Sequence, residues 1–355
     1  MRLARSLPWV AAAVLFGVFP ILFSNPTITS IAVFSVIFMA SATAWNGFSG
    51  YSGYVCLGHA AFFGTGAYVL AIISTVANFS GGYGVFWLVP LGGLVAAAVA
   101  VPFGLVALRT RRHTFVVVTI AVFFIFQLLA TNLSFTGGSS GKSTPTPPWM
   151  AVGYNDRFYY AALLCLVTAF AISVVIRRSR FGLQLFAIRD DEDRAAGLGV
   201  KVTRVKLIAF VISAFSVGMA GAIWAYFLGQ VYPQFAFDPL FDLSIAIMAF
   251  FGGLGTLSGP LIGAAILESL QQYFTIQFSS DDLYLIAYGA LFLIVILILP
   301  RGVVPTIASL GADRRARRAG QKAELPYGGL GAVASPRTHR TSSLSGLVRH
   351  ASQDH

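Results

Sequence analysis

Charged side chains are scarce in this chain of 355 residues. Asp, Glu, Lys and Arg make up 10% of the sequence, whereas soluble domains contain about 25%. Hydrophobic residues make up 57%, and the mean hydropathy is +0.77. This composition excludes an ordinary water-soluble domain and predicts that most of the chain lies in a lipid bilayer.

Cysteine and metal-binding motifs are also nearly absent. The chain has two cysteines, Cys56 and Cys165, each within an apolar run, so no disulfide framework or CxxC site is predicted. The HExxH and GxSxG motifs do not occur, and of five histidines only His59 and His113 precede the C-terminal tail. We therefore expect no catalytic residues, no metal and no cofactor, and we expect that the chain is not an enzyme.

Long apolar runs are abundant, and they predict the fold class. Runs such as Leu88 to Leu108 approach or exceed the roughly 20 residues with which a helix crosses a bilayer. They lack the alternation of a membrane β-barrel. We predict an all-α, polytopic transmembrane helix bundle of about ten spans. The expected spans are 7–23, 28–47, 54–76, 85–108, 114–133, 158–176, 206–228, 241–256, 258–277 and 283–300.

Basic residues predict the orientation of these spans. The net charge of +11 is concentrated at the ends of apolar runs and in the tail, a pattern that fits the positive-inside rule better than nucleic-acid binding. Both termini are expected in the cytoplasm of a bacterial cell, with the chain crossing its inner membrane. Residues 1–310 are the expected transmembrane domain, with a cytoplasmic loop at about 177–206. Residues 311–355 are polar and are expected to form a disordered tail.

Two glycine-rich segments interrupt apolar runs in the two halves of the chain, from Gly50 to Tyr68 and from Gly252 to Gly263. Broken helices in corresponding halves indicate a transport path, although small residues also serve plain helix packing. The candidate path residues are Gly50, Gly53, His59, Gly64, Gly66, Gly252, Gly253, Gly255 and Glu268.

His59 and Glu268 are included because polar groups inside a membrane are functional candidates by default. A packing hydrogen bond for His59, or a structural pair facing the bundle interior for Glu268, is the plainer interpretation.

A charged segment from Arg189 to Gly199 lies in the predicted cytoplasmic loop. Its acids gather early, as at a helix N-terminus, and Gly199 can end the helix. Such a helix offers Ala195, Ala196 and Leu198 to a groove on a cytoplasmic partner. The alternative is a solvated linker helix with its own ion pairs. The candidate docking residues are Arg189, Asp190, Asp191, Glu192, Ala195, Ala196, Leu198 and Gly199.

The segment from Thr136 to Ser143 has the glycines and lysine of a phosphate-binding loop. Thr136 occupies the position of the first glycine, and prolines follow where a helix is required. We therefore expect no nucleotide site there.

Four stretches together resemble a known family: Gly50 to Gly53 with Leu57 to Tyr68, Thr136 to Ser139, Ser179 to Gly199, and Gly252 to Pro260. They are similar to the permease subunits of branched-chain amino acid ABC transporters of the LivM-like kind, over roughly residues 30–305. The sequence departs from the usual pattern at Tyr54 and Cys56, where the family commonly has Gln and Ser.

The resemblance implies a heteromeric importer. The expected partners are a second, homologous permease subunit, two cytoplasmic ATPase subunits and an extracytoplasmic solute-binding protein, with the segment from Arg189 to Gly199 as the coupling helix. ATP hydrolysis is expected in the partners, and solute is expected to move by alternating access.

Three other functions fit the sequence. An importer of urea or short amides would share these motifs. An ion-coupled secondary transporter would use Glu268, His59 or Asp242 as the coupling site. A membrane scaffold would bind a partner through its loop without moving solute.

Overall fold

The computed structural model describes residues 16–23, 25–149, 153–277, 289–290 and 302–306. The expected tail at 311–355 lies outside these residues, as does nearly all of the expected last span at 283–300. Of the expected first span, only residues 16–23 are described, and 16–22 are helical.

Long helices account for most of the described chain. They are α2 (Pro26–Trp45), α3 (His59–Val76), α4 (Leu88–Ala107), α5 (Arg112–Asn132), α6 (Tyr154–Arg178), α9 (Val202–Leu228), α11 (Pro239–Gly252) and α12 (Gly259–Gln277). The shorter elements are η1 (Asn46–Gly50), η2 (Tyr83–Trp87), η3 (Ser134–Thr136), η4 (Gly138–Ser140), β1 (Lys142–Ser143), α7 (Arg180–Asp190), α8 (Glu192–Gly197), β2 (Gln230–Val231) and α10 (Pro233–Ala236).

Seven segments of the described chain are long and apolar enough to cross a membrane, which fits the predicted helical bundle. They are Pro26–Gly50, His59–Val76, Tyr83–Ala107, Arg112–Asn132, Tyr154–Arg178, Val202–Leu228 and Pro233–Gly252. The prediction of about ten spans is not confirmed. Helix α12 has the predicted position but is less apolar than these seven.

Two predicted span boundaries are wrong because non-helical segments, 53–58 and 253–258, each begin there at a glycine. The span expected at 54–76 begins at His59, and the span expected at 241–256 ends at Gly252. Gly53 and Gly253 have φ of 73° and 123°, which glycine adopts without a steric penalty. The backbone therefore leaves the helix at both points.

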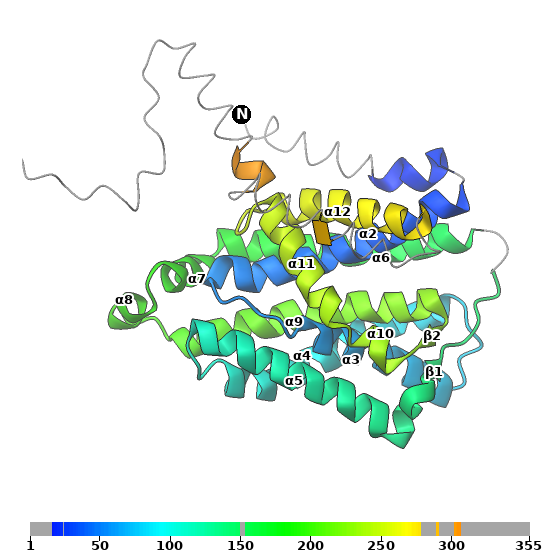
Figure 1. Cartoon of the computed structure of the whole chain (residues 1–355), viewed down its shortest axis with the longest axis horizontal. Coiled ribbons are helices and arrows are strands. Elements are labelled where there is room, and N and C mark those ends of the chain that lie inside the picture. The colour runs from blue at the N-terminus through cyan, green and yellow to red at the C-terminus, as the bar shows by residue number, and fades with distance from the viewer. Residues whose placement is uncertain (1–15, 24, 150–152, 278–288, 291–301, 307–355) are drawn as a thin grey trace, which may run out of the picture. The chain divides into compact units, whose positions relative to one another are not determined.

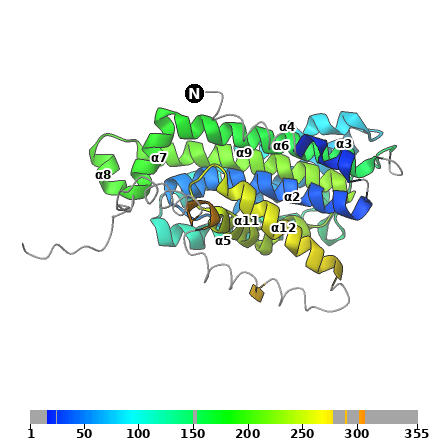
Figure 2. The ribbon, with the colours of Figure 1, turned by 90° about the horizontal axis from the view of Figure 1, so that it is seen from above.

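The long helices run side by side, with α8 at one end of the bundle and the β1–β2 pair at the other (Figures 1 and 2). Helix α9 packs against α3, α4, α2 and α6, and α12 packs against α2 and α11. Nearly all of the C-terminal half of α9 is buried. Each helix hydrogen-bonds its own backbone, as a segment in a lipid environment requires.

Small residues let α3, α4 and α9 approach closely. A Cβ atom at Gly66 of α3 would overlap the backbone of Gly218 in α9. A Cβ atom at Gly92 of α4 would lie 3.1 Å from the carbonyl oxygen of Gly66. Backbones in direct contact gain van der Waals energy along their whole length, which is how membrane helices commonly associate.

Candidate functional site

The segment predicted to dock on a partner consists of two short helices. The sequence predicted one helix from Arg189 to Gly199, and that prediction is wrong. Helix α7 ends at Asp190, Asp191 is extended with φ −156° and ψ 111°, and α8 begins at Glu192. The side chain of Asp191 accepts a hydrogen bond from the backbone N–H of Arg194 at 3.0 Å. Asp191 is therefore the N-cap of α8 and the joint between the two helices.

The exposed surface of α8 differs from the predicted apolar face. Ala195 is buried, with 2% of its surface exposed, whereas Ala196 is exposed and Leu198 is 85% exposed. Gly199, with φ 87°, lets the chain turn away after α8. Only Ala196 and Leu198 of the three predicted contact residues are thus available to a partner.

Arg189, at the end of α7, reaches two glycine turns from opposite halves of the sequence. Its Nη1 donates a hydrogen bond to the carbonyl oxygen of Gly50 at 2.7 Å. A Cβ atom at Gly53 would lie 3.0 Å from Cγ of Arg189, and one at Gly255 would overlap Nη1. The arginine side chain therefore fills the space beside these glycines that a larger residue would occupy.

Asn46 in η1 holds the two glycine turns together. Its Oδ1 accepts from the backbone N–H of Gly255 at 2.7 Å, and its Nδ2 donates to the carbonyl oxygen of Thr256 at 2.9 Å. Arg177 of α6 donates to the carbonyl oxygen of Gly255 at 3.1 Å. The segment of residues 50–53, which begins at the end of η1, and the turn of residues 253–256 between α11 and α12 thus form one junction. We call it the glycine junction.

A second contact anchors the first residue of α8. Oε1 of Glu192 accepts from Nζ of Lys206 in α9 at 2.7 Å, and Oε2 accepts from the hydroxyl of Tyr54. Lys206 is buried, and its Nζ also lies 4.1 Å from the ring centroid of Tyr54. Burial raises the pKa of Glu192, but the hydrogen bonds from Lys206 and Tyr54 outweigh it, so the net pKa is below its usual value.

Arg112, at the start of α5, holds the end of α7. Its Nη2 donates to the carbonyl oxygens of Ile188 and Arg189 at 3.1 and 2.6 Å. These carbonyls end a helix, where a cation also interacts favourably with the helix dipole. The sequence does not predict these hydrogen bonds of Asn46, Arg112, Arg177 and Lys206, because nothing local marks a basic or amide side chain as a tertiary donor.

The predicted path glycines fall into two separate groups. Gly50, Gly53, Gly253 and Gly255 belong to the glycine junction, and Gly252 lies beside it in contact with Gly259. Gly64 and Gly66 lie within α3, where added Cβ atoms would overlap Phe237 and Gly218. Those two glycines serve close packing in this structure.

His59 is fully buried at the start of α3. Its Nε2 lies 2.7 Å from Oγ of Ser213 in α9, and the rings of Phe62 and Phe210 contact it edge-on. Asp242 of α11 accepts the backbone N–H of Ala60 on both carboxylate oxygens, at 3.1 and 3.2 Å. The two side chains join α3 to α9 and α11.

Glu268 lies in α12, away from the glycine junction. It is fully buried, and Gln272 one turn later donates to its Oε1 at 2.9 Å. Among the residues that the structure describes, its Oε2 has no hydrogen-bond partner. Because one turn of helix separates Glu268 from Gln272, one of the two carboxylate oxygens receives a hydrogen bond from within α12.

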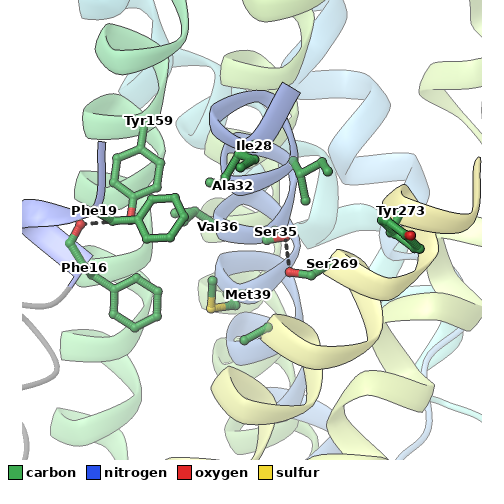
Figure 3. Close-up of a pocket in the computed structure, with 12 residues that line it drawn as sticks. Phe16, Phe19, Ile28, Ala32, Ser35, Val36, Met39, Tyr159, Ser269 and Tyr273 are labelled. Atoms are coloured by element: carbon green, nitrogen blue, oxygen red, sulfur yellow. Dashed lines mark hydrogen bonds between the residues drawn. The ribbon is translucent and has the colours of Figure 1, made fainter. Parts of the chain in front are cut away.

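An apolar cavity of about 330 Å³ lies beside α12 (Figure 3). Residues of the 16–22 helix, α2, α6 and α12 line it, including Phe16, Phe19, Met39, Tyr159 and Tyr273. A hydrogen bond of 3.0 Å joins Ser35 of α2 to Ser269 of α12 at its wall. Glu268 does not line this cavity.

The family of the chain follows from its sequence. Residues 27–298 match the family model described as "Branched-chain amino acid transport system / permease component". The chain belongs to this family of permease components. The match covers every long helix described above, together with the α7–α8 segment and both glycine turns.

Three relatives illustrate the range of the similarity. The chain is 29% identical to the high-affinity branched-chain amino acid transport system permease protein LivM of Escherichia coli (strain K12), over 83% of this chain and 74% of that protein. It is 27% identical to LivH of the same strain, over 72% and 87%. It is 26% identical to the ribose import permease protein RbsC of Bacillus subtilis (strain 168), over 55% and 62%. No solved structure matches the chain.

Proposed function

We propose that this chain is the membrane-spanning subunit of an ATP-binding-cassette importer that carries branched-chain amino acids or a similar small polar solute inward. The observation that carries the proposal is α8. It is a short exposed helix that follows α7 at the joint residue Asp191, and it is anchored to the bundle by Glu192. A helix of this kind can enter a groove on an ATPase subunit while its base stays fixed.

The α7–α8 end of the bundle would face the cytoplasm of a bacterial cell. Supporting this orientation, Arg112, Arg177 and Arg189 all donate hydrogen bonds at that end. Arginines concentrate on the cytoplasmic side of inner-membrane proteins. The opposite end, with the β1–β2 pair, would then receive solute from an extracytoplasmic binding protein.

The complete importer would contain a second permease subunit of the same family and two ATPase subunits. LivM and LivH are both named as permease proteins of a branched-chain amino acid transport system, and this chain is similar to each. ATP would be hydrolysed by the ATPase subunits. Closure of those subunits would move α8, and the bundle would change from an outward-open to an inward-open state. Net import requires that ATP and solute each favour one of these states.

Branched-chain amino acids are the favoured solute because the family and the LivM and LivH relatives carry that name. The ribose import permease RbsC matches a smaller part of the chain. Uptake of radiolabelled leucine, urea and ribose by vesicles that contain the assembled complex would assign the solute. Leucine uptake driven by ATP is the expected result, and uptake driven by an ion gradient in the absence of ATP would contradict the proposal.

Leu198→Asp is expected to prevent docking of the ATPase subunits. Leu198 is 85% exposed at the end of α8, and burying an unpaired charge in an apolar contact costs more than about 2 kcal/mol. We expect at least about a tenfold loss of co-purified ATPase, with unchanged amounts of the permease in the membrane. The measurement is affinity purification of the tagged chain, followed by quantification of the ATPase subunits.

Val76→Asp is the matched control. Val76 is 73% exposed at the end of α3, next to Thr75, whose hydroxyl donates to the carbonyl oxygen of Ser143 in β1. It receives the same change of an exposed apolar residue to Asp and should retain the ATPase. Full ATPase recovery with Leu198→Asp would contradict docking through α8. Substitutions at Glu192 or Ala195 would be poorer probes of docking, because they would also disturb the fold. Glu192 pairs with Lys206, and Ala195 is buried.

A further inference from the structure

Arg189 links the α7–α8 segment to both glycine turns. Among the described residues of that segment, it is the one whose side chain contacts glycines from both halves of the chain. It hydrogen-bonds Gly50, which is 139 residues away in sequence, and it lies against Gly255. The backbone of Gly255 is in turn held by Asn46 and Arg177. Side chains from η1, α6 and α7 therefore all contact Gly255, in the turn between α11 and α12.

The position of Arg189 makes it sensitive to movement of α8. Only Asp190 and Asp191 separate it from the first residue of α8. The carbonyl oxygens at the end of α7 are held by Arg112. A displacement of α8 must therefore be taken up either at Asp191 or by movement of the Arg189 side chain.

The glycine turns are the places where the bundle can respond. Gly53, Gly253 and Gly255 have φ of 73°, 123° and 78°. Each turn ends one helix and precedes another, and short segments at helix ends absorb the backbone changes in hinge motions. A rigid link to these turns would change the angle of α3 relative to α2, and of α12 relative to α11.

We propose that Arg189 is the positioning residue that transmits movement of α8 to the two glycine turns, so that partner docking opens or closes the helix pairs on either side of them. The inference rests on the proposed function, because it requires a partner that moves α8. It goes further by assigning the transmission to one side chain and its two backbone targets. Arginine suits this role because its planar group offers several donors in fixed directions.

Arg189→Gln, Arg189→Lys and Arg180→Gln test the proposal in the reconstituted complex with its ATPase subunits and binding protein. Gln cannot reach Gly50 with the geometry of a guanidinium, whereas Lys keeps the charge and one donor to the Gly50 carbonyl. Arg180 is exposed at the other end of α7, so its replacement removes the same charge from the same helix. The readouts are the yield of assembled complex, the rate of ATP hydrolysis and the rate of leucine uptake.

The expected result is uncoupling. Arg189→Gln should assemble normally and hydrolyse ATP, but the leucine taken up per ATP hydrolysed should fall about tenfold. Arg189→Lys should recover part of that ratio, and Arg180→Gln should retain the wild-type ratio. A purely structural role would instead lower assembly, hydrolysis and uptake together.

An unchanged uptake-to-hydrolysis ratio in Arg189→Gln would overturn the inference while leaving the proposed function intact. Equal loss of the ratio in Arg180→Gln would also overturn it, because the effect would then belong to charge alone. If Arg189→Gln does not assemble, Arg189→Lys decides: a wild-type ratio would overturn the inference, and a lowered ratio in assembled complex would support it. A wild-type complex that neither hydrolyses ATP nor takes up leucine would refute the proposed function instead.

Discussion

Gly66→Ala is expected to destabilise the protein so strongly that little folded protein is found in the membrane. The added methyl group would overlap the carbonyl group of Gly218, and a backbone cannot move aside as a flexible side chain can. Helices α3 and α9 would have to separate, which would also disturb Gly92 of α4, since Gly92 lies against Gly66. Overpacking costs 1–3 kcal/mol where side chains can adjust, so we expect a loss of about 3 kcal/mol or more here.

The measurement is the midpoint of thermal unfolding in detergent, together with the amount of folded protein recovered. Gly17→Ala is the matched control, because a Cβ atom at Gly17 meets no atom of the described residues within 4 Å and residues 16–22 are helical. In an exposed helix this change should stabilise by up to about 1 kcal/mol. The same chemical change should therefore have opposite signs at the two positions. Normal stability of Gly66→Ala would contradict the close contact of α3 with α9.

The helices could be predicted from the sequence, because in a bilayer both their length and their composition are dictated by the solvent. Helices α4, α5, α6 and α9 begin and end within a few residues of the predicted spans. The errors at His59 and Gly252 arose because apolar residues continue past the point where glycines turn the chain. Hydropathy reports whether a residue prefers lipid or water. It does not report the positive φ with which Gly53 and Gly253 turn the backbone out of a helix.

The junction around Arg189 could not be predicted. The sequence placed Gly50 and Gly255 on a transport path and Arg189 on a docking helix, and no local pattern relates residues more than a hundred positions apart. The break at Asp191 did have a local signal, since Asp followed by Glu192 and Asp193 is typical of an N-cap and first turn. The prediction placed the start of that helix at Arg189, three residues before α8 begins at Glu192.

The role of Lys206 is hidden from sequence reasoning for a related reason. In the sequence it follows Lys201 and Arg204 and looks like one more charge of a basic loop. In the structure its side chain is 2% exposed and pairs with Glu192. Sequence reveals the number and position of charges, but the partner that makes burial of a charge tolerable is a tertiary contact.

Glu192→Ala is expected to destabilise the α8 end of the bundle by about 2 kcal/mol, because it leaves the Lys206 ammonium buried without its counter-ion. Breaking a fully buried pair costs 3–5 kcal/mol. We expect a smaller cost than that range because 32% of the Glu192 side chain is exposed. The Tyr54 hydroxyl loses its acceptor at the same time. The measurement is thermal unfolding in detergent, combined with the rate of protease cleavage within α8.

Glu192→Ala with Lys206→Met is the control that separates charge from packing. Removing both charges leaves no buried ion, and such replacements are often close to neutral. The double variant should recover more than half of the lost stability, with the Tyr54 hydroxyl accounting for the remainder. If the double variant were as unstable as the single one, the ion pair would not be the source of the stability.

The pH dependence of the same pair is a third test of the contact. Because the net pKa of Glu192 is lowered from its ordinary value of 4.5, the stability that it contributes is fully present above pH 4.5. That contribution is lost as the pH falls through the lowered pKa, where the folded state takes up the proton. The stability difference between wild type and Glu192→Ala should therefore be constant from about pH 5 to 8 and shrink only below pH 4.5. A difference that already shrinks between pH 7 and 5 would mean that Lys206 and Tyr54 do not hold the ionised carboxylate, and α8 would then lack the fixed base from which a docked partner could move it.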